Sequence, residues 1–235
     1  MKRGVLLALM LLGFVFIVYA AAIDGINLVS PVNNTFSNGS NDTIAFTFNY
    51  TGDAALVANC SLFLNGTGYG GNSSVNNGSE TILRANNTLG DGVYSWNITC
   101  NNGTARASLG LLNITIDTTA PTIANGSSPS NQTISNNLTP KFDWTTSTEL
   151  NFDNYTIQIS NATTFAAVNH TFNVSGRTDS NVTVPIAELN LSPNKVWYWR
   201  VISYDKANNG VLGDINIYTT DNIAPIASGE SPTGN

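Results

Sequence analysis

This sequence contains few charged residues. They make up 10% of the 235-residue chain, against about 25% in an ordinary globular protein. Nine lysines and arginines against fifteen aspartates and glutamates give a formal net charge of -6, which argues against a nucleic-acid partner because such binding needs clustered basic residues. Hydrophobic residues still account for 42% of the chain. That share is enough to bury cores, so the low charge does not indicate disorder.

The residues and motifs of common catalytic sites are also scarce. His170 is the only histidine. In a β-strand it would point to the same face as Phe172 and Val174, which predicts a partly buried strand residue rather than a catalytic base. The sequence has no Gly-x-Ser-x-Gly, no His-Glu-x-x-His, no phosphate-binding glycine loop and no EF-hand pattern. We therefore expect a protein that is not an enzyme, with no cofactor and no metal site.

Two ligand hypotheses remain open beside this expectation. Asp117 and Asp221 lie at predicted domain junctions and Asp205 lies in a loop, where oxygen ligands would suit calcium, although the preferred interpretation is solvated turn residues. The tryptophans 144, 197 and 199 fit core positions. A carbohydrate platform would then use exposed tyrosines: Tyr69, Tyr198, Tyr204 and Tyr218.

The N-terminus has the pattern of an export signal. Lys2 and Arg3 precede an uncharged apolar run that ends in the small residues 20–22, so residues 1–22 are predicted to be a signal peptide. An uncleaved signal anchor is an alternative, because residues 5–23 are nearly long enough to span a bilayer. A pilin-type signal, cut after Gly4, is a second alternative. All three place the remaining chain outside the cytoplasm.

Acceptor sequons of the Asn-x-Ser/Thr type occur twenty-one times. Because side chains alternate between the two faces of a strand, the phase of each asparagine tells whether it faces solvent. Asn97 lies between Trp96 and Ile98, and several others also alternate with large apolar residues. The predicted glycosylation candidates are Asn49, Asn97, Asn113, Asn154, Asn173 and Asn181.

Apolar residues alternate with polar ones along most of the chain, which indicates β-strands. The predicted strands are 44–50, 59–64, 93–100, 111–117, 155–160, 182–186, 197–204 and 215–219, with one helical turn at 187–191. Asn-Gly and Asp-Gly pairs between them are typical of tight hairpin turns. Many short strands of this kind predict an all-β sandwich fold.

An internal repeat sets the predicted domain boundaries. Asp117-Thr-Thr-Ala-Pro121 recurs as Asp221-Asn-Ile-Ala-Pro225, and the Ser-Pro pairs at positions 30, 128 and 231 follow a similar interval. The interval is close to 100 residues, the size of an immunoglobulin-type domain. We therefore predict β-sandwiches at 23–119 and 120–221, and at 222–235 a linker with the start of a third repeat in a truncated array.

Two stretches resemble known domain families. Residues 26–117 resemble the immunoglobulin-like domains of archaeal surface proteins, through Asn59-Cys60-Ser-Leu-Phe-Leu-Asn65-Gly66 and Leu89-Gly-Asp-Gly-Val-Tyr-Ser-Trp96-Asn-Ile-Thr-Cys100. Residues 122–220 resemble a fibronectin type III domain, through Thr139-Pro-Lys-Phe-Asp-Trp144 and Leu191-Ser-Pro-Asn-Lys-Val-Trp197. That family carries tyrosine where Trp197 stands. An indole N–H can replace the tyrosine hydroxyl as a hydrogen-bond donor.

The two cysteines, Cys60 and Cys100, are predicted to form a disulfide, because an even count in an exported chain indicates a bridge. Each shares a face with the large apolar residues of its strand. In such sandwiches the third and sixth strands are neighbours in one sheet, which would bring the two cysteines together. Antibody domains differ, since their bridge joins the two sheets.

These observations lead to one functional expectation and two alternatives. The expectation is a non-catalytic structural or adhesion module of a repeat array at the cell surface, with a protein or glycan partner. The first alternative is an accessory region of a larger secreted hydrolase. The second is a pilin-like filament subunit.

Overall fold

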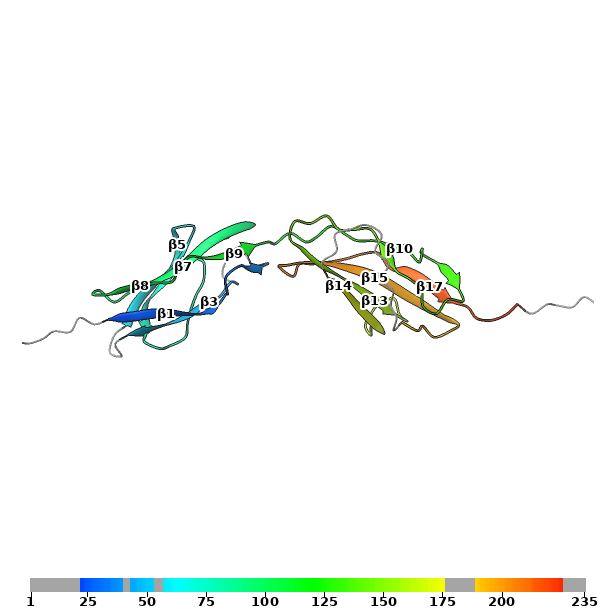
Figure 1. Ribbon diagram of the computed structural model, residues 1–235, viewed down its shortest axis with the longest axis horizontal. Helices are drawn as coiled ribbons and strands as arrows, with labels where there is room; N and C mark the ends of the chain where they lie inside the picture. Colours follow the sequence, from blue (N-terminus) through cyan, green and yellow to red (C-terminus); the bar gives the residue numbers. More distant parts are fainter. Residues whose placement is uncertain (1–21, 40–42, 53–56, 176–188, 226–235) are drawn as a thin grey trace, which may run out of the picture. The chain divides into compact units, whose positions relative to one another are not determined.

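The computed structural model describes residues 22–39, 43–52, 57–175 and 189–225. Within these residues every regular secondary-structure element is a β-strand (Figure 1). The all-β prediction is therefore confirmed. The predicted signal or anchor helix at 1–22, apart from Ala22, lies outside the described residues. So do the predicted strand at 182–186, most of the predicted helical turn and positions 226–235. Among the described residues, no helix has the length and apolar character needed to cross a membrane.

In the described residues, the first pair of sheets contains β1 to β9. One sheet has the order β1-β3-β6, with β1 at Ile23–Ser30, β3 at Phe46–Gly52 and β6 at Thr81–Leu83. The other has the order β2-β9-β7-β4-β5, with β8 paired to β7. Its strands are β2 Thr35–Ser37, β4 Val57–Leu64, β5 Thr67–Asn76, β7 Gly92–Asn101, β8 Arg106–Ser108 and β9 Leu112–Ile116.

The alternation predicted from the sequence is present in these strands. Every second residue of β4 from position 58 to 64 is fully buried, as are Trp96, Ile98 and Cys100 of β7. Phe46 of β3 meets Trp96 edge to face, with ring centroids 4.9 Å apart. Because apolar side chains from the two sheets meet in one core, each strand buries one face and leaves the other to solvent.

The second pair of sheets repeats this plan. The smaller sheet pairs β10 (Gly126–Ser128) with β12 (Asp143–Trp144). The larger has the order β11-β17-β15-β13-β14, with β16 paired to β15. Its strands are β11 Thr133–Ser135, β13 Phe152–Ser160, β14 His170–Ser175, β15 Lys195–Asp205, β16 Gly210–Leu212 and β17 Asn216–Thr220. Trp199 lies in its core against Phe142, at 4.9 Å between ring centroids.

The predicted strands and the strands of the structure agree where the alternation is strong. The strands predicted at 59–64, 93–100, 155–160 and 197–204 correspond to β4, β7, β13 and β15. The prediction omitted β1, β5 and the strands β2, β6, β8, β10, β11, β12, β14 and β16. The reason is visible in β5, whose sequence Thr-Gly-Tyr-Gly-Gly-Asn-Ser-Ser-Val-Asn buries only Val75, because an edge strand needs few apolar residues.

The internal repeat extends further than the Ser-Pro pairs. Residues 30–38 read Ser-Pro-Val-Asn-Asn-Thr-Phe-Ser-Asn and residues 128–136 read Ser-Pro-Ser-Asn-Gln-Thr-Ile-Ser-Asn. Both copies have a cis Ser-Pro peptide bond. After it the chain moves to the other sheet, where β2 runs parallel to β9 and β11 runs parallel to β17. We call these two segments the Ser-Pro motifs.

The two Ser-Pro motifs also make the same hydrogen bonds. The Asn33 side chain accepts the N–H of Asn113, and the Asn131 side chain accepts the N–H of Ile217. Asn34 and Gln132 have positive φ angles of 64° and 65°. The repeated sequence therefore makes the chain cross from one sheet to the other in the same way in both copies. The spacing of the prolines alone did not predict this crossing.

Gly126 provides a test of core packing in the second pair of sheets. A Cβ atom at this position would meet the Trp199 ring and the Asn216 side-chain amide. We expect Gly126→Ala to lower the free energy of unfolding by about 1–3 kcal/mol, the usual cost of overpacking a core. Gly90→Ala is the control, because a Cβ there meets no atom within 4 Å. Urea denaturation measures both, and equal stability of the two variants would contradict the packing described.

Candidate functional site

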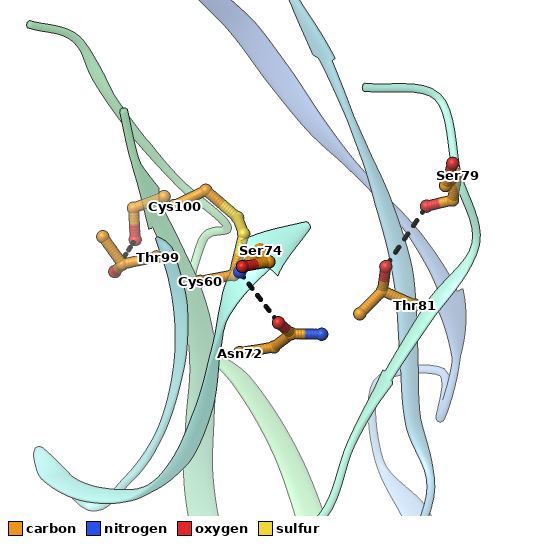
Figure 2. The surroundings of a disulfide bond; sticks show 8 residues. Cys60, Asn72, Ser74, Ser79, Thr81, Thr99 and Cys100 are labelled. Atoms are coloured by element: carbon orange, nitrogen blue, oxygen red, sulfur yellow. Dashed lines mark hydrogen bonds between the residues drawn. A yellow bond between two sulfur atoms is a disulfide. The ribbon is translucent and has the colours of Figure 1, made fainter. Parts of the chain in front are cut away.

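Cys60 and Cys100 form a disulfide between neighbouring strands of one sheet. The S–S distance is 2.04 Å and the Cα atoms are 4.0 Å apart. The two residues are register partners in the antiparallel pair of β4 and β7, and both are fully buried. Figure 2 shows the bond beside Thr99 and the segment Asn72–Ser74 of β5. The prediction of a bridge within one sheet is confirmed.

The outer face of the same sheet carries a shallow groove, which we call the β4–β7 groove. Its floor consists of the residues that alternate with the buried ones. Its lining residues are Asn59, Ser61, Phe63, Gly66, Asn97, Thr99, Asn101, Arg106 and Leu111. Most are polar, but Leu111 is 73% exposed and Phe63 is half-buried. The described residues thus place an aromatic ring, amides, hydroxyls and one cation on a single surface.

The register explains how Phe63 and Asn97 come together. They are opposite each other on β4 and β7, and the partner of Phe63 on β5 is Gly68. Cross-strand partners on one face have Cβ atoms about 4.5–5.5 Å apart. Gly68 has no side chain, and a Cβ there would lie 4.0 Å from Phe63 Cε1, so Gly68 contributes no side chain to cover the ring.

The predicted glycosylation candidates in the described residues all keep some exposure. Asn113 and Asn173 are exposed, whereas Asn49, Asn97 and Asn154 are intermediate. Asn97 Nδ2 donates a hydrogen bond to Ser108 Oγ at 3.1 Å. Asn181 lies outside the described residues. Glycosylation itself stays a prediction.

The carboxylates considered for calcium are held by amide and main-chain N–H groups. Asp117 and Asp205 are buried, at 5% and 2% exposure, which differs from the solvated turn residues expected. Asp205 accepts hydrogen bonds from the backbone N–H and the side-chain amide of Asn209. Asp117 accepts one from Asn151 Nδ2 at 2.7 Å. Asp221 is exposed and accepts the N–H of Ile223.

In the described part of the chain, no group of three or more histidine, cysteine, aspartate or glutamate side chains is arranged to hold a metal ion. His170 begins β14 and is half-buried. Its ring lies near Phe172 and Trp197, with centroids 6.3 Å and 6.2 Å away. This position agrees with the predicted strand residue.

The aromatic predictions were partly wrong. Trp144, Trp197 and Trp199 are buried as expected. Tyr218 is also buried, at 2% exposure, and its hydroxyl donates to the carbonyl oxygen of Asn137, so it is not an exposed platform. Phe63, the aromatic ring that does line a groove, was missed. Its outward phase between Leu62 and Leu64 was the available signal.

The Trp197 substitution in the fibronectin-type corner behaves as expected. Its indole Nε1–H donates to the Ser192 carbonyl oxygen at 3.4 Å. The corner thus keeps a side-chain donor to the backbone although the tyrosine hydroxyl is absent.

Asp91 is a structural carboxylate that sequence reasoning missed. Its oxygens accept hydrogen bonds from the hydroxyls of Thr118 and Thr119 and from the N–H of Thr118. These bonds favour the charged form and hold the pKa of Asp91 below its ordinary 3.8, with the Thr119 hydroxyl as the largest cause.

Comparison with known proteins identifies the fold. No protein-family model and no curated protein matches the chain. The structure is similar to the fibronectin(III)-like modules of Clostridium thermocellum CbhA, at 10% identity and a TM-score of 0.53, covering 83% of this chain and 94% of that chain. The FN1-FN3 domains of chicken CNTN1 are similar at 14% identity and a TM-score of 0.47, covering 81% of this chain and 68% of that chain. The first likeness shows a fibronectin type III-like, immunoglobulin-like β-sandwich fold.

The disulfide predicts a large stability difference. Closing a 40-residue separation restricts the unfolded chain, so we expect Cys60→Ala/Cys100→Ala to lower the free energy of unfolding by about 4 kcal/mol. Scanning calorimetry under reducing and non-reducing conditions measures the change. The second pair of sheets contains no cysteine and is the internal control. An unchanged unfolding transition of the first pair of sheets would contradict this expectation.

Asp91 predicts a pH effect. Because its pKa is lower in the folded state, its contribution to stability is present above the unfolded pKa near 3.8 and is lost as the pH falls through the folded pKa. Asp91→Asn is expected to reduce the loss of stability in that acidic window. Carbon-13 NMR titration of the Asp91 carboxyl checks the direction, and Thr119→Ala should raise the pKa. A pKa at or above 3.8 in the wild type would contradict the hydrogen bonding described.

Proposed function

We propose that this chain is a non-catalytic structural or adhesion module that acts outside the cytoplasm, at the cell surface, as part of a repeat array. The observation that carries the proposal is the buried Cys60–Cys100 disulfide in a β-sandwich core. Disulfides persist in oxidising compartments and are rare in the reducing cytosol. The apolar segment that follows Lys2 and Arg3 supplies a route of export.

The chemistry of the described surfaces supports a spacing or contact role. Their polarity comes largely from asparagine, serine and threonine, and we find no metal cluster among the described residues. Among the described residues, each larger sheet has β5 or β14 as a terminal strand, and terminal strands are the places where a protein partner can pair by backbone hydrogen bonds. The partner in this proposal is a protein or a glycan on a cell surface.

Export is tested on intact cells of the source organism. A membrane-impermeant biotin reagent and external protease should both reach the protein, while a cytosolic marker protein in the same cells stays unmodified. Thiol alkylation before and after reduction should show that Cys60 and Cys100 react only after reduction. A protein that is protected from both reagents, with two free thiols, would overturn the proposal.

The module role is tested by tethering. Mild extraction should release the protein together with other surface material rather than as a free, unattached protein. Crosslinking on intact cells should join it to other surface molecules. Recovery of the protein alone, in a soluble form with no crosslinked product, would contradict an adhesion or spacing role.

A further inference from the structure

The β4–β7 groove contains a complete glycosylation acceptor. Asn97-Ile98-Thr99 is a sequon, and both Asn97 and Thr99 line the groove together with Phe63, Arg106 and Leu111. Ile98 points the opposite way and is fully buried. A sugar attached at Asn97 would therefore leave the chain directly into the groove.

We propose that Asn97 is N-glycosylated and that its first sugar ring lies over Phe63, so that the glycan covers the β4–β7 groove of its own chain. This inference rests on the proposed export. The donor is an oligosaccharide joined to a lipid phosphate. The Asn97 Nδ2–C1 bond forms, the bond from C1 to the phosphate oxygen breaks, the lipid phosphate leaves with that electron pair, and Nδ2 loses one proton.

The hydrogen bonds at Asn97 are compatible with this attachment. Nδ2 has two hydrogens, and one of them is donated to Ser108 Oγ. Glycosylation replaces one hydrogen and leaves the other for Ser108. One N–H therefore remains after modification as a donor for Ser108.

Phe63 is the reason that the sugar lies in the groove rather than extending into solvent. Phe63 is the register partner of Asn97, and its partner on β5, Gly68, adds no side chain over the ring. Carbon–hydrogen faces of a pyranose pack well on an aromatic ring, and Leu111, which is 73% exposed, adds apolar surface to be covered. Arg106 on β8 supplies N–H donors for sugar hydroxyls.

Burial of the sequon hydroxyl sets the order of events. Thr99 is 7% exposed, and its Oγ1 lies 3.2 Å from Ser108 Oγ. A transferring enzyme that must reach this hydroxyl has access before β8 closes on β7. Sugar transfer therefore precedes the completion of this sheet.

Asn49 is the matched control site. It is also a half-buried sequon asparagine in the middle of a strand, but its register partner is Asn27. Asn27 Nδ2 donates to Asn49 Oδ1 at 3.0 Å. A glycan at Asn49 therefore has no aromatic partner across the strand.

The test is a double-mutant cycle in two hosts. The full chain, Asn97→Gln, Phe63→Ala, the double variant and Asn49→Gln are secreted from a eukaryotic host that attaches N-glycans and from a bacterial periplasm that does not. Glycopeptide mass spectrometry reports occupancy at Asn97. We expect the glycosylated chain to melt about 4 °C above its Asn97→Gln variant, and Phe63→Ala to remove that difference.

The controls separate a glycan contact from a general effect on the strand. In unglycosylated protein, the effect of Asn97→Gln on the melting temperature should be the same with and without Phe63. In glycosylated protein, Asn49→Gln should leave the melting temperature unchanged within about 1 °C. An unoccupied Asn97, or an Asn97→Gln effect of equal size with and without Phe63, overturns the inference. Phe63-dependent binding of free oligosaccharides to the unglycosylated protein also overturns it, in favour of a foreign glycan.

The surface labelling of source cells distinguishes this inference from the proposed function. A surface-exposed protein with an unmodified Asn97, shown by glycopeptide mapping of source material, defeats only the glycan inference. A protein confined to the cytosol defeats the proposed function, while the cycle in secreting hosts still decides whether a sugar at position 97 packs on Phe63.

Discussion

The alternation of buried apolar side chains with outward-facing, mostly uncharged polar ones along strands such as β4 is the constraint on which this structure depends. In β4 the alternate residues Ala58, Cys60, Leu62 and Leu64 are completely buried, while their neighbours face outward. Because the side-chain period of a strand is exactly two residues, a slip of one position would turn this whole set to solvent. The hydrophobic burial that closes the sandwich therefore also sets the register of its strands.

The register in turn determines what lies on the outer face. The pairing that brings Cys60 opposite Cys100 also brings Phe63 opposite Asn97. The disulfide on the inner face and the β4–β7 groove on the outer face are thus two consequences of one strand alignment. Since the polar residues of this chain are mostly uncharged, the outer surface can carry amides and hydroxyls at high density without the charge repulsion that ionised groups would cause.

Charged groups are few, and several of them have structural partners. Arg200 donates two hydrogen bonds to Gln158 Oε1 and lies 4.1 Å above the Phe165 ring. Asp91, Asp117 and Asp205 each accept hydrogen bonds from nearby hydroxyl or N–H groups. Asp91 is exposed, whereas Asp117 and Asp205 are buried, and a buried polar group is tolerated when hydrogen bonds replace water. These residues accordingly hold loops and strands in place, which is consistent with the non-catalytic role proposed for the chain.

The sequence by itself determined the all-β class, the strands with strong alternation, and the presence of a disulfide, because each depends on local periodicity or on residue type in a given compartment. Trp197 as a substitute donor could also be foreseen, since a single indole N–H replaces a single hydroxyl. Only the tertiary structure decided that Tyr218 is buried, that Asp117 and Asp205 are enclosed by amide groups, and that the Ser-Pro motifs move the chain between sheets. It alone placed Phe63 beside Asn97, because partners 34 residues apart in the chain are chosen by strand register, and register is settled by the packing of the whole core.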